Sequence, residues 1–304
     1  MLKKYRGGAI GKETLRFIVH KLKRIFPYYF VAWCIGFTVL HTAPVVSFRQ
    51  ILKDLIQSIP AFLQLSVAGF PVYQAIDPAW YISAMLLSML VLYPLILIWK
   101  ENFSLIIAPI LAIGIYGFLF SKVGSLATIN PLEDGFIYTG LMRGIAGICL
   151  GCMCFEGAQA LSRKSFSLKG KKVLTGMEIL CYLAVFAGMN TQGLLRPDLY
   201  IVLLLIPAVT LSFSGQSYTS SFKICRWKKG RIRFEEVSLA IFLADYPARE
   251  LTKKLFPYAQ RDERIVPCVL IVVVLATLIL LIVPVINRGS EWVIKKTQTT
   301  WFVD

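Results

Sequence analysis

The sequence predicts an all-α protein, a polytopic bundle of transmembrane helices with about eight spans and with both termini in the cytoplasm. Three observations support this fold class. Of the 304 residues, 57% are hydrophobic and only 16% are charged, whereas about a quarter of the residues of a soluble domain are charged. The apolar residues form runs long enough to cross the hydrocarbon core of a bilayer, which is roughly 30 Å thick. Lysine and arginine gather in alternate connecting segments.

The predicted spans are runs of about 17 to 25 apolar residues, the length that a bilayer requires. The two most apolar runs, 79–99 and 265–286, contain no charged residue. The weakest run, 236–256, is apolar only as far as Tyr246 and becomes amphipathic after Pro247. In chain order the spans are 25–42, 79–99, 103–120, 138–160, 173–191, 199–216, 236–256 and 265–286.

The distribution of basic residues orients the spans, because cytoplasmic loops carry an excess of lysine and arginine. Residues 1–24 contain eight of them, the loop 161–172 contains five and the loop 217–235 contains six, whereas the alternate long loops contain one or two each. Both termini are therefore predicted to be cytoplasmic. The chain then divides into a basic N-terminal segment (1–24), a membrane domain (25–286) and a cytoplasmic C-terminal tail (287–304).

The basic excess and the cysteines limit the expected partners. The net charge of +16 follows from topology and from attraction to anionic lipid, so the bilayer is the expected partner and nucleic acid is not. The same charges can attract a phosphorylated cosubstrate to the cytoplasmic rim, and a charge count does not separate these two roles. Cys152 and Cys154 have no second Cys or His pair to complete a metal site,. We therefore predict no metal and no bound cofactor.

The segment 43–78 is predicted to contain an amphipathic helix that lies at the outer interface. Apolar residues recur there at three- and four-residue spacing, opposite charged and amide side chains. Such a helix can seal the bundle or roof a cavity. The apolar positions are Phe48, Ile51, Leu52, Leu55, Ile56 and Ile59, and the polar positions are Arg49, Gln50, Lys53 and Asp54.

Charged residues inside spans are costly in lipid and are candidates for function. Glu156 and Glu178 lie near cytoplasmic ends, where they can reach water or basic loop residues. Arg143 lies about one turn inside the outer end of its span, where its side chain can extend outward. Asp245 lies in the middle of its span and needs a partner or a wet cavity. Arg143 is the nearest partner in depth, and such a pair can equally serve to lock two helices together.

Four stretches of the chain, in collinear order, resemble the bacterial integral-membrane acyltransferases known as acyltransferase family 3. They are residues 17–27 (FIVHKLKRIFP), residues 80–84 with 92–95 (WYISA and LYPL), Arg143 with Gly147 and Gly151, and residues 238–247 (SLAIFLADYP). They are similar, in this order, to the family's basic motif before its third span, its W-x-L-S and Y-P-L motifs, its R-x-x-x-x-x-x-x-G helix and its S-Y-x-I-Y-L-x-H-x-P segment.

The resemblance implies a membrane-bound enzyme of the bacterial inner membrane. It would transfer an acyl group, most often acetyl from acetyl-CoA, to a hydroxyl of a cell-surface carbohydrate or related acceptor. A base would take the hydroxyl proton while the oxygen attacks the thioester. Lys21 and Arg24, at the cytoplasmic mouth, can bind the phosphates of the acyl-CoA cosubstrate or serve only as topology anchors. The intramembrane polar candidates are Arg143, Asp245, Trp80 and Ser83.

The chain also departs from the family pattern. The resemblance implies two further spans before the basic motif, which here introduces the first span, and those spans hold an Arg-x10-His motif whose His is the expected base. Ala9 and Phe30 occupy the arginine positions for His20 and His41. Asp245 aligns with the family's late histidine and is the only candidate base. We therefore expect one of two proteins. The first is an O-acyltransferase whose reading frame extends upstream and which is inactive as these 304 residues, because the first two spans and the usual base are missing; the second is a non-catalytic eight-span protein that binds an acyl donor, a polysaccharide or a partner subunit. A transporter is disfavoured by the lack of an inverted repeat.

Overall fold

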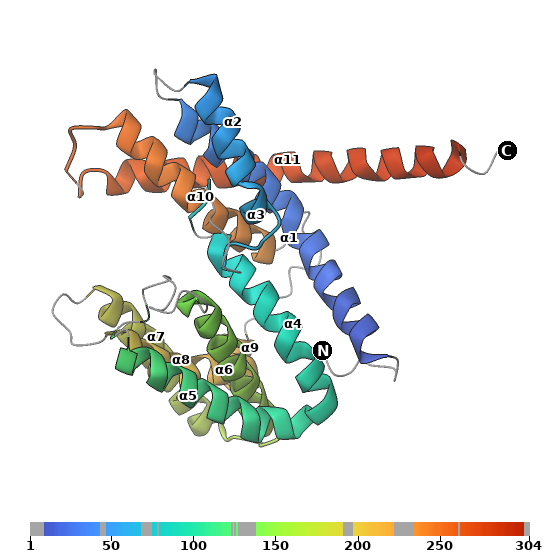
Figure 1. Cartoon of the computed structure of the whole chain (residues 1–304). Coiled ribbons are helices and arrows are strands. Elements are labelled where there is room, and N and C mark those ends of the chain that lie inside the picture. Colours follow the sequence, from blue (N-terminus) through green and yellow to red (C-terminus); the bar gives the residue numbers. More distant parts are fainter. Residues whose placement is uncertain are drawn as a thin grey trace. The chain divides into compact units, whose positions relative to one another are not determined.

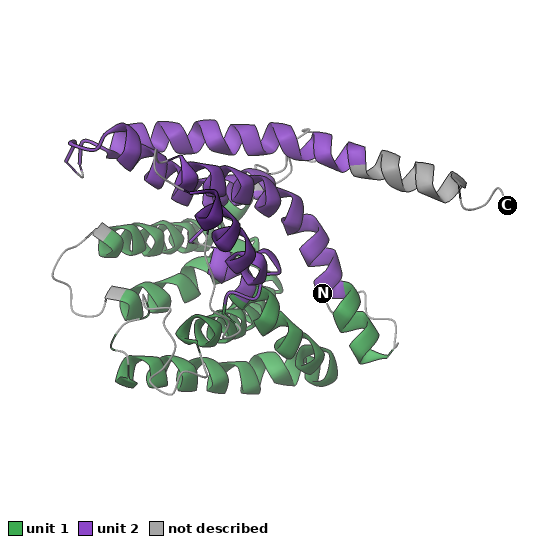
Figure 2. Cartoon of the chain, turned by 45° about the horizontal axis from the view of Figure 1, so that its top comes forward, with its two compact units in different colours: residues 1–16, 67–69, 84–227 green, residues 17–66, 70–83, 228–304 purple. Residues whose placement is uncertain are grey.

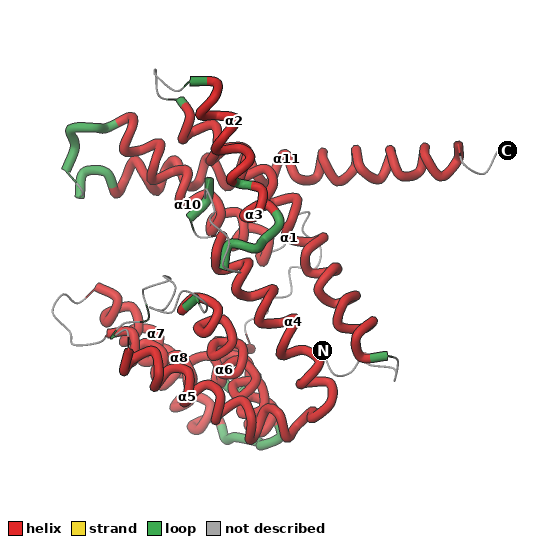
Figure 3. The backbone as a smooth tube through the Cα atoms, viewed as in Figure 1, coloured by secondary structure: helices red, strands yellow, loops and turns green. Residues whose placement is uncertain are grey.

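A computed structural model describes residues 9–42, 47–67, 75–77, 79–122, 124, 126, 138–190, 197–221, 234–260 and 262–300. The regular elements of these residues are helices (Figures 1 and 3), which confirms the predicted all-α class. The elements are α1 (Ile10–His41), α2 (Phe48–Gln57), α3 (Ile59–Phe62), α4 (Ala79–Asn102), the π-helix η2 (Phe103–Ile107), α5 (Ala108–Lys122), α6 (Thr139–Ser162), α7 (Leu168–Asn190), α8 (Pro197–Ser214), α9 (Tyr218–Ser221), α10 (Phe234–Leu255) and α11 (Ile265–Thr300).

Four of the described segments are long and apolar enough to cross a membrane, which confirms a helical membrane protein. They are Ala79–Lys122, Thr139–Ser162, Leu168–Met189 and Ile265–Gly289, and Asp198–Ser214 is a shorter apolar helix. The predicted spans 25–42 and 236–256 lie in α1 and α10, which are not among these four segments. The count of eight spans and the cytoplasmic location of the termini therefore remain predictions.

The longest apolar segment, Ala79–Lys122, changes direction within its length. At 1.5 Å per residue, a straight helix of its 44 residues would be about 66 Å long, twice the thickness of the hydrocarbon core,. Lys100 interrupts the helix with φ 46° and ψ −118°, and the π-helix η2 follows. Figure 1 shows α4 and α5 running in different directions on either side of this corner. The break falls where the sequence separates the predicted spans 79–99 and 103–120.

The chain forms two compact units, shown in Figure 2. The first consists of residues 1–16, 67–69 and 84–227, and in it α5 packs on α6, α6 packs on α8 and α7 packs on α8. The second consists of residues 17–66, 70–83 and 228–304, and in it α10 packs on α11.

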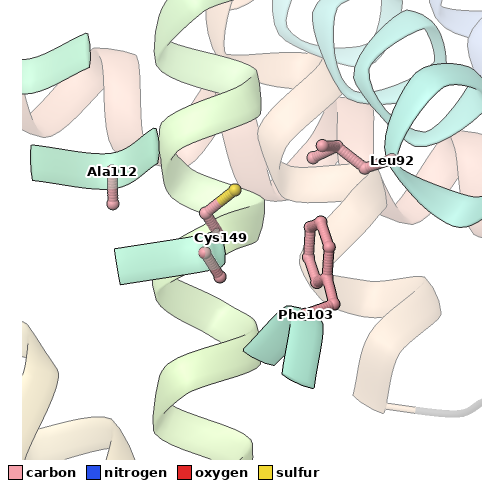
Figure 4. Packing of buried hydrophobic residues seen from close by; sticks show 5 residues of the cluster. Leu92, Phe103, Ala112 and Cys149 are labelled. Atoms are coloured by element: carbon pink, nitrogen blue, oxygen red, sulfur yellow. The ribbon is translucent and has the colours of Figure 1, made fainter. Parts of the chain in front are cut away.

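The core of the first unit joins α4, η2, α5 and α6. Phe103 and Cys149 are fully buried there, together with Leu92, Ala108 and Ala112 (Figure 4). Cys149 acts as an apolar packing residue, as its position in an apolar run predicts. The cluster fixes the corner between α4 and α5 against α6.

Close packing between α4 and α6 depends on Gly144. A Cβ atom at this position would lie 2.7 Å from Ser88 Oγ and 3.1 Å from the Ala84 carbonyl oxygen, whereas a Cβ at Gly147 or Gly151 would meet nothing within 4 Å. The glycine that permits close approach is thus Gly144, and not the two glycines of the family-like pattern.

The predicted amphipathic helix is present as α2, and its location at the outer interface remains a prediction. Its apolar side chains Phe48, Leu52 and Ile56 are exposed, while Asp54 is only 6% exposed. The Ser47 hydroxyl accepts the Gln50 N–H and caps the helix N-terminus,. Of the four polar positions, Asp54 alone is buried, whereas Arg49, Gln50 and Lys53 are exposed. Asp54 therefore points into the second unit.

The C-terminal end of α1 is capped by a lysine from α10. Lys254 Nζ donates to the carbonyl oxygens of Val39 and Leu40 at 2.5 and 3.2 Å, and to Thr42 Oγ1 at 3.3 Å. A cation at this position satisfies free carbonyls and complements the negative end of the helix dipole.

Candidate functional site

A cavity of about 480 Å³ lies in the first unit, where the corner between α4 and α5 faces α6. One wall comes from the corner itself and from the helices that follow it. Its lining residues recur at helical spacing, so that one face of η2 and α5 forms this wall. They are Glu101, Ser104, Leu105 and Pro109.

The opposite wall is the C-terminal half of α6. Its lining residues also recur at three- and four-residue intervals, which places them on one face of the helix. Glu156 lies in the middle of this face and Arg163 at its end. The wall consists mainly of Met153, Glu156, Gln159, Ala160 and Arg163.

The backbone beside the cavity departs from regular helix. Lys100 has a positive φ of 46°, a conformation that costs a residue other than glycine about 1–3 kcal/mol and that concentrates at functional sites. The π-helix η2 begins three residues later, and short π-helical turns are frequent at such sites. Phe103 and Ser104 of η2 are buried, so this irregular backbone is anchored in the core.

The lining combines complementary hydrogen-bonding groups with an apolar surface. The carboxylates of Glu101 and Glu156 accept hydrogen bonds, while the Arg163 guanidinium can only donate them,. Leu105 and Met153 supply apolar area. The cavity can therefore hold an elongated neutral group that carries both donors and acceptors, with an anionic group next to Arg163.

Glu178 is the centre of a second polar cluster in the first unit. It is only 5% exposed and accepts hydrogen bonds from Ser212 Oγ at 2.7 Å and from Thr219 Oγ1 at 2.5 Å. The Tyr182 hydroxyl lies 3.0 Å from Ser212 Oγ. The sequence suggests water or basic loop residues as its partners, whereas hydroxyls of α8 and α9 bind it in the structure. This network joins α7, α8 and α9.

We expect Glu178→Ala to lower the free energy of unfolding by about 1–3 kcal/mol, because the hydroxyls of Ser212 and Thr219 lose their acceptor,. The measurement is the thermal unfolding midpoint of the purified protein in mild detergent. Glu263→Ala, at an exposed position, is the control. Equal midpoints for the two variants would contradict a structural role for Glu178.

A buried histidine–aspartate pair lies in the second unit, between α1 and α2. His41 Nε2 is 3.1 Å from Asp54 Oδ2, and His41 Nδ1 is 2.8 Å from the Phe37 carbonyl oxygen. Gln50 Nε2 donates to Asp54 Oδ1 at 2.7 Å. Since a carbonyl oxygen only accepts, Nδ1 carries a hydrogen, and one further proton is shared between Nε2 and Asp54. Both ring nitrogens of His41 are thus engaged.

The predicted phosphate-binding residues Lys21 and Arg24 lie on α1. Arg24 forms an ion pair with Glu235 of α10. Lys21 Nζ lies 5.8 Å from the centre of the Phe17 ring, within the range of a cation–π contact,. Both cations therefore have partners within the second unit.

Asp245 has its partner on its own helix. Arg249 Nη2 lies 2.8 Å from Asp245 Oδ2, and both side chains are about half exposed, at 48% and 47%. The sequence predicts a partner for this carboxylate, and an arginine one turn away meets that need. Arg143 belongs to the first unit, and its pairing with Asp245 remains a prediction.

The structure brings two of the family-like stretches together. Ser83 is fully buried, and the Trp80 ring packs edge-to-face on Tyr81, with centroids 6.0 Å apart. Tyr81 in turn contacts Phe242 of α10, with centroids 6.1 Å apart. Residues 80–83 therefore lie beside the stretch 238–247 that contains Asp245.

A family model described as an acyltransferase domain, acyltransferase family 3, matches residues 8–288. The searches of curated proteins and of solved structures found no match. The matched range includes the cavity, the His41–Asp54 pair and all the stretches from which the sequence resemblance was drawn.

Proposed function

Because the chain belongs to acyltransferase family 3, we propose that it is a membrane-bound O-acyltransferase that uses acyl-CoA, most simply acetyl-CoA, as its donor. The acceptor is a hydroxyl of a cell-surface carbohydrate or a related molecule, and the location is the bacterial inner membrane. The observation that carries this proposal is the family match over residues 8–288. The apolar helices supply the membrane context.

In the proposed reaction, the acceptor oxygen attacks the thioester carbonyl carbon. The new C–O bond forms, the C–S bond breaks, and the hydroxyl proton passes through a base to the departing thiolate. Asp245 is the candidate base, since it takes the place of the late histidine in the family-like stretch 238–247 and its carboxylate, paired with Arg249, is about half exposed.

The cavity at the α4–α5 corner is proposed to hold the pantetheine arm of the donor. Its volume of about 480 Å³ is within the usual range for ligand pockets, roughly 300–1,000 Å³. The arm is uncharged and its amides both donate and accept, which suits Glu101, Glu156 and the apolar wall. The phosphates would remain outside, near Arg163 and the exposed Lys164, in the loop that the charge distribution predicts to be cytoplasmic.

Binding of acetyl-CoA to the full chain in lipid nanodiscs tests this assignment, together with transfer of labelled acetyl to a mixture of carbohydrate acceptors. We expect Ala160→Trp, which fills the cavity, to weaken acetyl-CoA binding by at least about tenfold, which corresponds to roughly 1.4 kcal/mol. Arg163→Gln is expected to weaken acetyl-CoA while leaving acetyl-pantetheine, the arm alone, unchanged. Ala187→Trp, at an exposed position on α7, is the control. Unchanged acetyl-CoA binding by Ala160→Trp would overturn the cavity assignment.

A second candidate function is a non-catalytic binding protein of the same family. The state of the two histidines favours it. Neither His20 nor His41 follows an arginine at the Arg-x10-His spacing, and both ring nitrogens of His41 are engaged. Acetyl-CoA binding without any acetyl transfer would support this candidate over the enzyme. The rate of acetyl transfer by Asp245→Asn tests the enzyme. A fall of about 100-fold or more, the scale of a lost general base, would support it. Glu250→Gln, on the same helix, is the control.

A further inference from the structure

We propose that the segment 48–67 re-enters the membrane beside α1, and that its inner end, at Trp33, Gln64 and Ser66, binds the hydroxyl-bearing acceptor. The acceptor role rests on the proposed function, whereas the re-entrant path and the binding site rest on the contacts described below. Trp33, Gln64, Ser66 and the segment as far as residue 66 lie in the second unit, and Val67 belongs to the first.

The segment runs antiparallel to α1. Asp54 contacts His41 near the end of α1, and further along the segment the Ala61 carbonyl oxygen accepts the hydroxyl of Tyr29, at 3.0 Å. Figure 1 shows α2 and α3 following α1. Residues 29 to 41 of a helix extend about 18 Å. If the span 25–42 crosses the bilayer as predicted, the segment returns to membrane depth and does not lie flat on the outer surface.

The outward face of the segment suits lipid. Phe48, Leu52, Ile56, Ile59 and Leu63 are between 46% and 80% exposed and recur at three- and four-residue spacing. Asp54, Ser58, Gln64 and Ser66 of the segment are buried, whereas Arg49, Gln50 and Lys53 near its start are exposed. A segment in lipid is expected to turn apolar side chains away from the protein, and the exposed charges at its start would lie at the outer interface.

The inner end of the segment contains buried polar atoms without hydrogen-bond partners. They are Trp33 Nε1, both amide heteroatoms of Gln64, and Ser66 Oγ. Among the described residues, only Arg264 Nε shares this property, so the unpaired atoms concentrate at one place. The Gln64 amide lies near the Tyr29 hydroxyl, which donates its own hydrogen to the Ala61 carbonyl oxygen. An unpaired polar group is costly in a buried setting, and a native protein normally supplies it with a partner. The missing partner here is expected to be a ligand.

The backbone at this end is also unusual. Gln64 has φ 60°, which is in the left-handed region,. Its N–H and that of Leu65 are both satisfied, by the carbonyl oxygens of Ala61 and Pro60. Residues 63–67 are not helical, and non-helical backbone at membrane depth is tolerated where it is buried in protein or lines a wet cavity. The backbone N–H groups of this end are therefore satisfied, while the buried polar atoms of the side chains are not.

The unpaired groups indicate the chemistry of the ligand. The indole N–H only donates, the amide donates and accepts, and the serine hydroxyl does both, so a neutral hydroxyl group matches them. None of the three side chains is charged, which disfavours a phosphate or carboxylate. The Phe62 ring packs against Phe26 and Trp33, with centroids 5.1 and 5.6 Å away. These rings provide an apolar wall for the carbon face of a sugar.

Gln64→Leu tests the site, with Gln50→Leu as the matched control on the same segment. Gln64→Leu removes two unpaired atoms, so we expect the unfolding temperature without ligand to be equal to or above that of the unchanged protein. The Gln50 side chain donates a hydrogen bond to Asp54, so Gln50→Leu is expected to lower the unfolding temperature. The probes are methyl glucoside and methyl N-acetylglucosaminide, and we expect thermal stabilisation by at least one of them to be lost in Gln64→Leu and Ser66→Ala. Acetyl-CoA binding should not change.

The path of the segment has its own test. Phe48→Cys and Leu63→Cys place thiols at positions that are 80% and 61% exposed in the protein. We expect a membrane-impermeant maleimide to label position 48 and to spare position 63, where lipid would cover the thiol. Equal labelling of both positions would overturn the re-entrant path.

The outcomes separate this inference from the proposed function. Stabilisation by neither glycoside, or equal stabilisation of Gln64→Leu, would overturn the binding site even if the protein transfers acetyl groups. Suppose instead that a glycoside binds the unchanged protein, that this binding is lost in Gln64→Leu, and that the protein transfers no acetyl group. This result would support the binding site and overturn the proposed enzymatic activity. A drop in stability for Gln64→Leu as large as for Gln50→Leu would show that Gln64 is a structural residue.

Discussion

Gly36→Ala is expected to lower the unfolding temperature of the protein strongly, although it adds a single methyl group. A Cβ atom at Gly36 would lie 2.3 Å from the carbonyl oxygen of Ala75 and 3.4 Å from Pro247 Cγ. The nearest atom belongs to the backbone and cannot rotate away, so α1 must separate from residues 75–77. Overpacking of this kind costs about 1–3 kcal/mol and sometimes more.

Gly11→Ala is the matched control because it lies on the same helix, and a Cβ there would meet nothing within 4 Å. Alanine at an open helical position is favoured over glycine by up to about 1 kcal/mol, so this variant is expected to be unchanged or slightly more stable. The measurement is thermal unfolding in mild detergent. The same midpoint for both variants would contradict the close approach at Gly36.

The second large effect is expected at the His41–Asp54 pair. Both side chains are 9% exposed, so the removal of one partner leaves a buried polar or charged group without its counterpart, at a cost of about 3–5 kcal/mol. We expect His41→Ala and Asp54→Ala each to lower the unfolding temperature. The double variant should lose less free energy of unfolding than the two single variants lose in sum, because the two side chains interact.

A second measurement follows the position of α2 directly. Arg49 and Lys53 are exposed sites for trypsin on α2, and release of α2 from α1 should accelerate cleavage at both. Thr38→Ala, at an exposed position of α1, is the control and should leave the cleavage rate unchanged. Strictly additive losses in the double variant, with unchanged cleavage, would show that the pair does not hold α2.

The sequence predicts the apolar helices well because that signal is local. Runs such as 79–99 and 265–286 need no knowledge of neighbouring elements, and both are helical in the structure. The break at Lys100 was also predictable, since a charged turn separates two apolar runs there. The functional features are less accessible, because they depend on which helices meet.

The role of Asp54 shows why the amphipathic pattern was insufficient. The periodicity of 48–59 correctly predicts a helix, but the predicted location at the outer interface leaves open which of its side chains contact the protein. Here the apolar side is exposed and Asp54 is buried against His41. In a membrane, lipid can receive the apolar face, and so the pattern alone does not say which side faces inward.

Glu178 and Gly144 show a second limit of sequence analysis. The hydroxyls that bind Glu178 lie 34 and 41 residues away, so no local motif contains both partners. Gly144, Gly147 and Gly151 are alike in sequence, and only contact with Ala84 and Ser88 selects Gly144 as the packing position.

The lysine cap of α1 has a consequence for how the protein is made. Lys254 lies 215 residues after Val39, whose carbonyl oxygen it binds. At about 5–20 residues per second, a ribosome needs roughly 10–40 s to synthesise the intervening chain. During this time the end of the first helix lacks its cation, and only the arrival of α10 completes it. A nascent chain interrupted before residue 254 would therefore carry an α1 whose last carbonyl oxygens lack this cation.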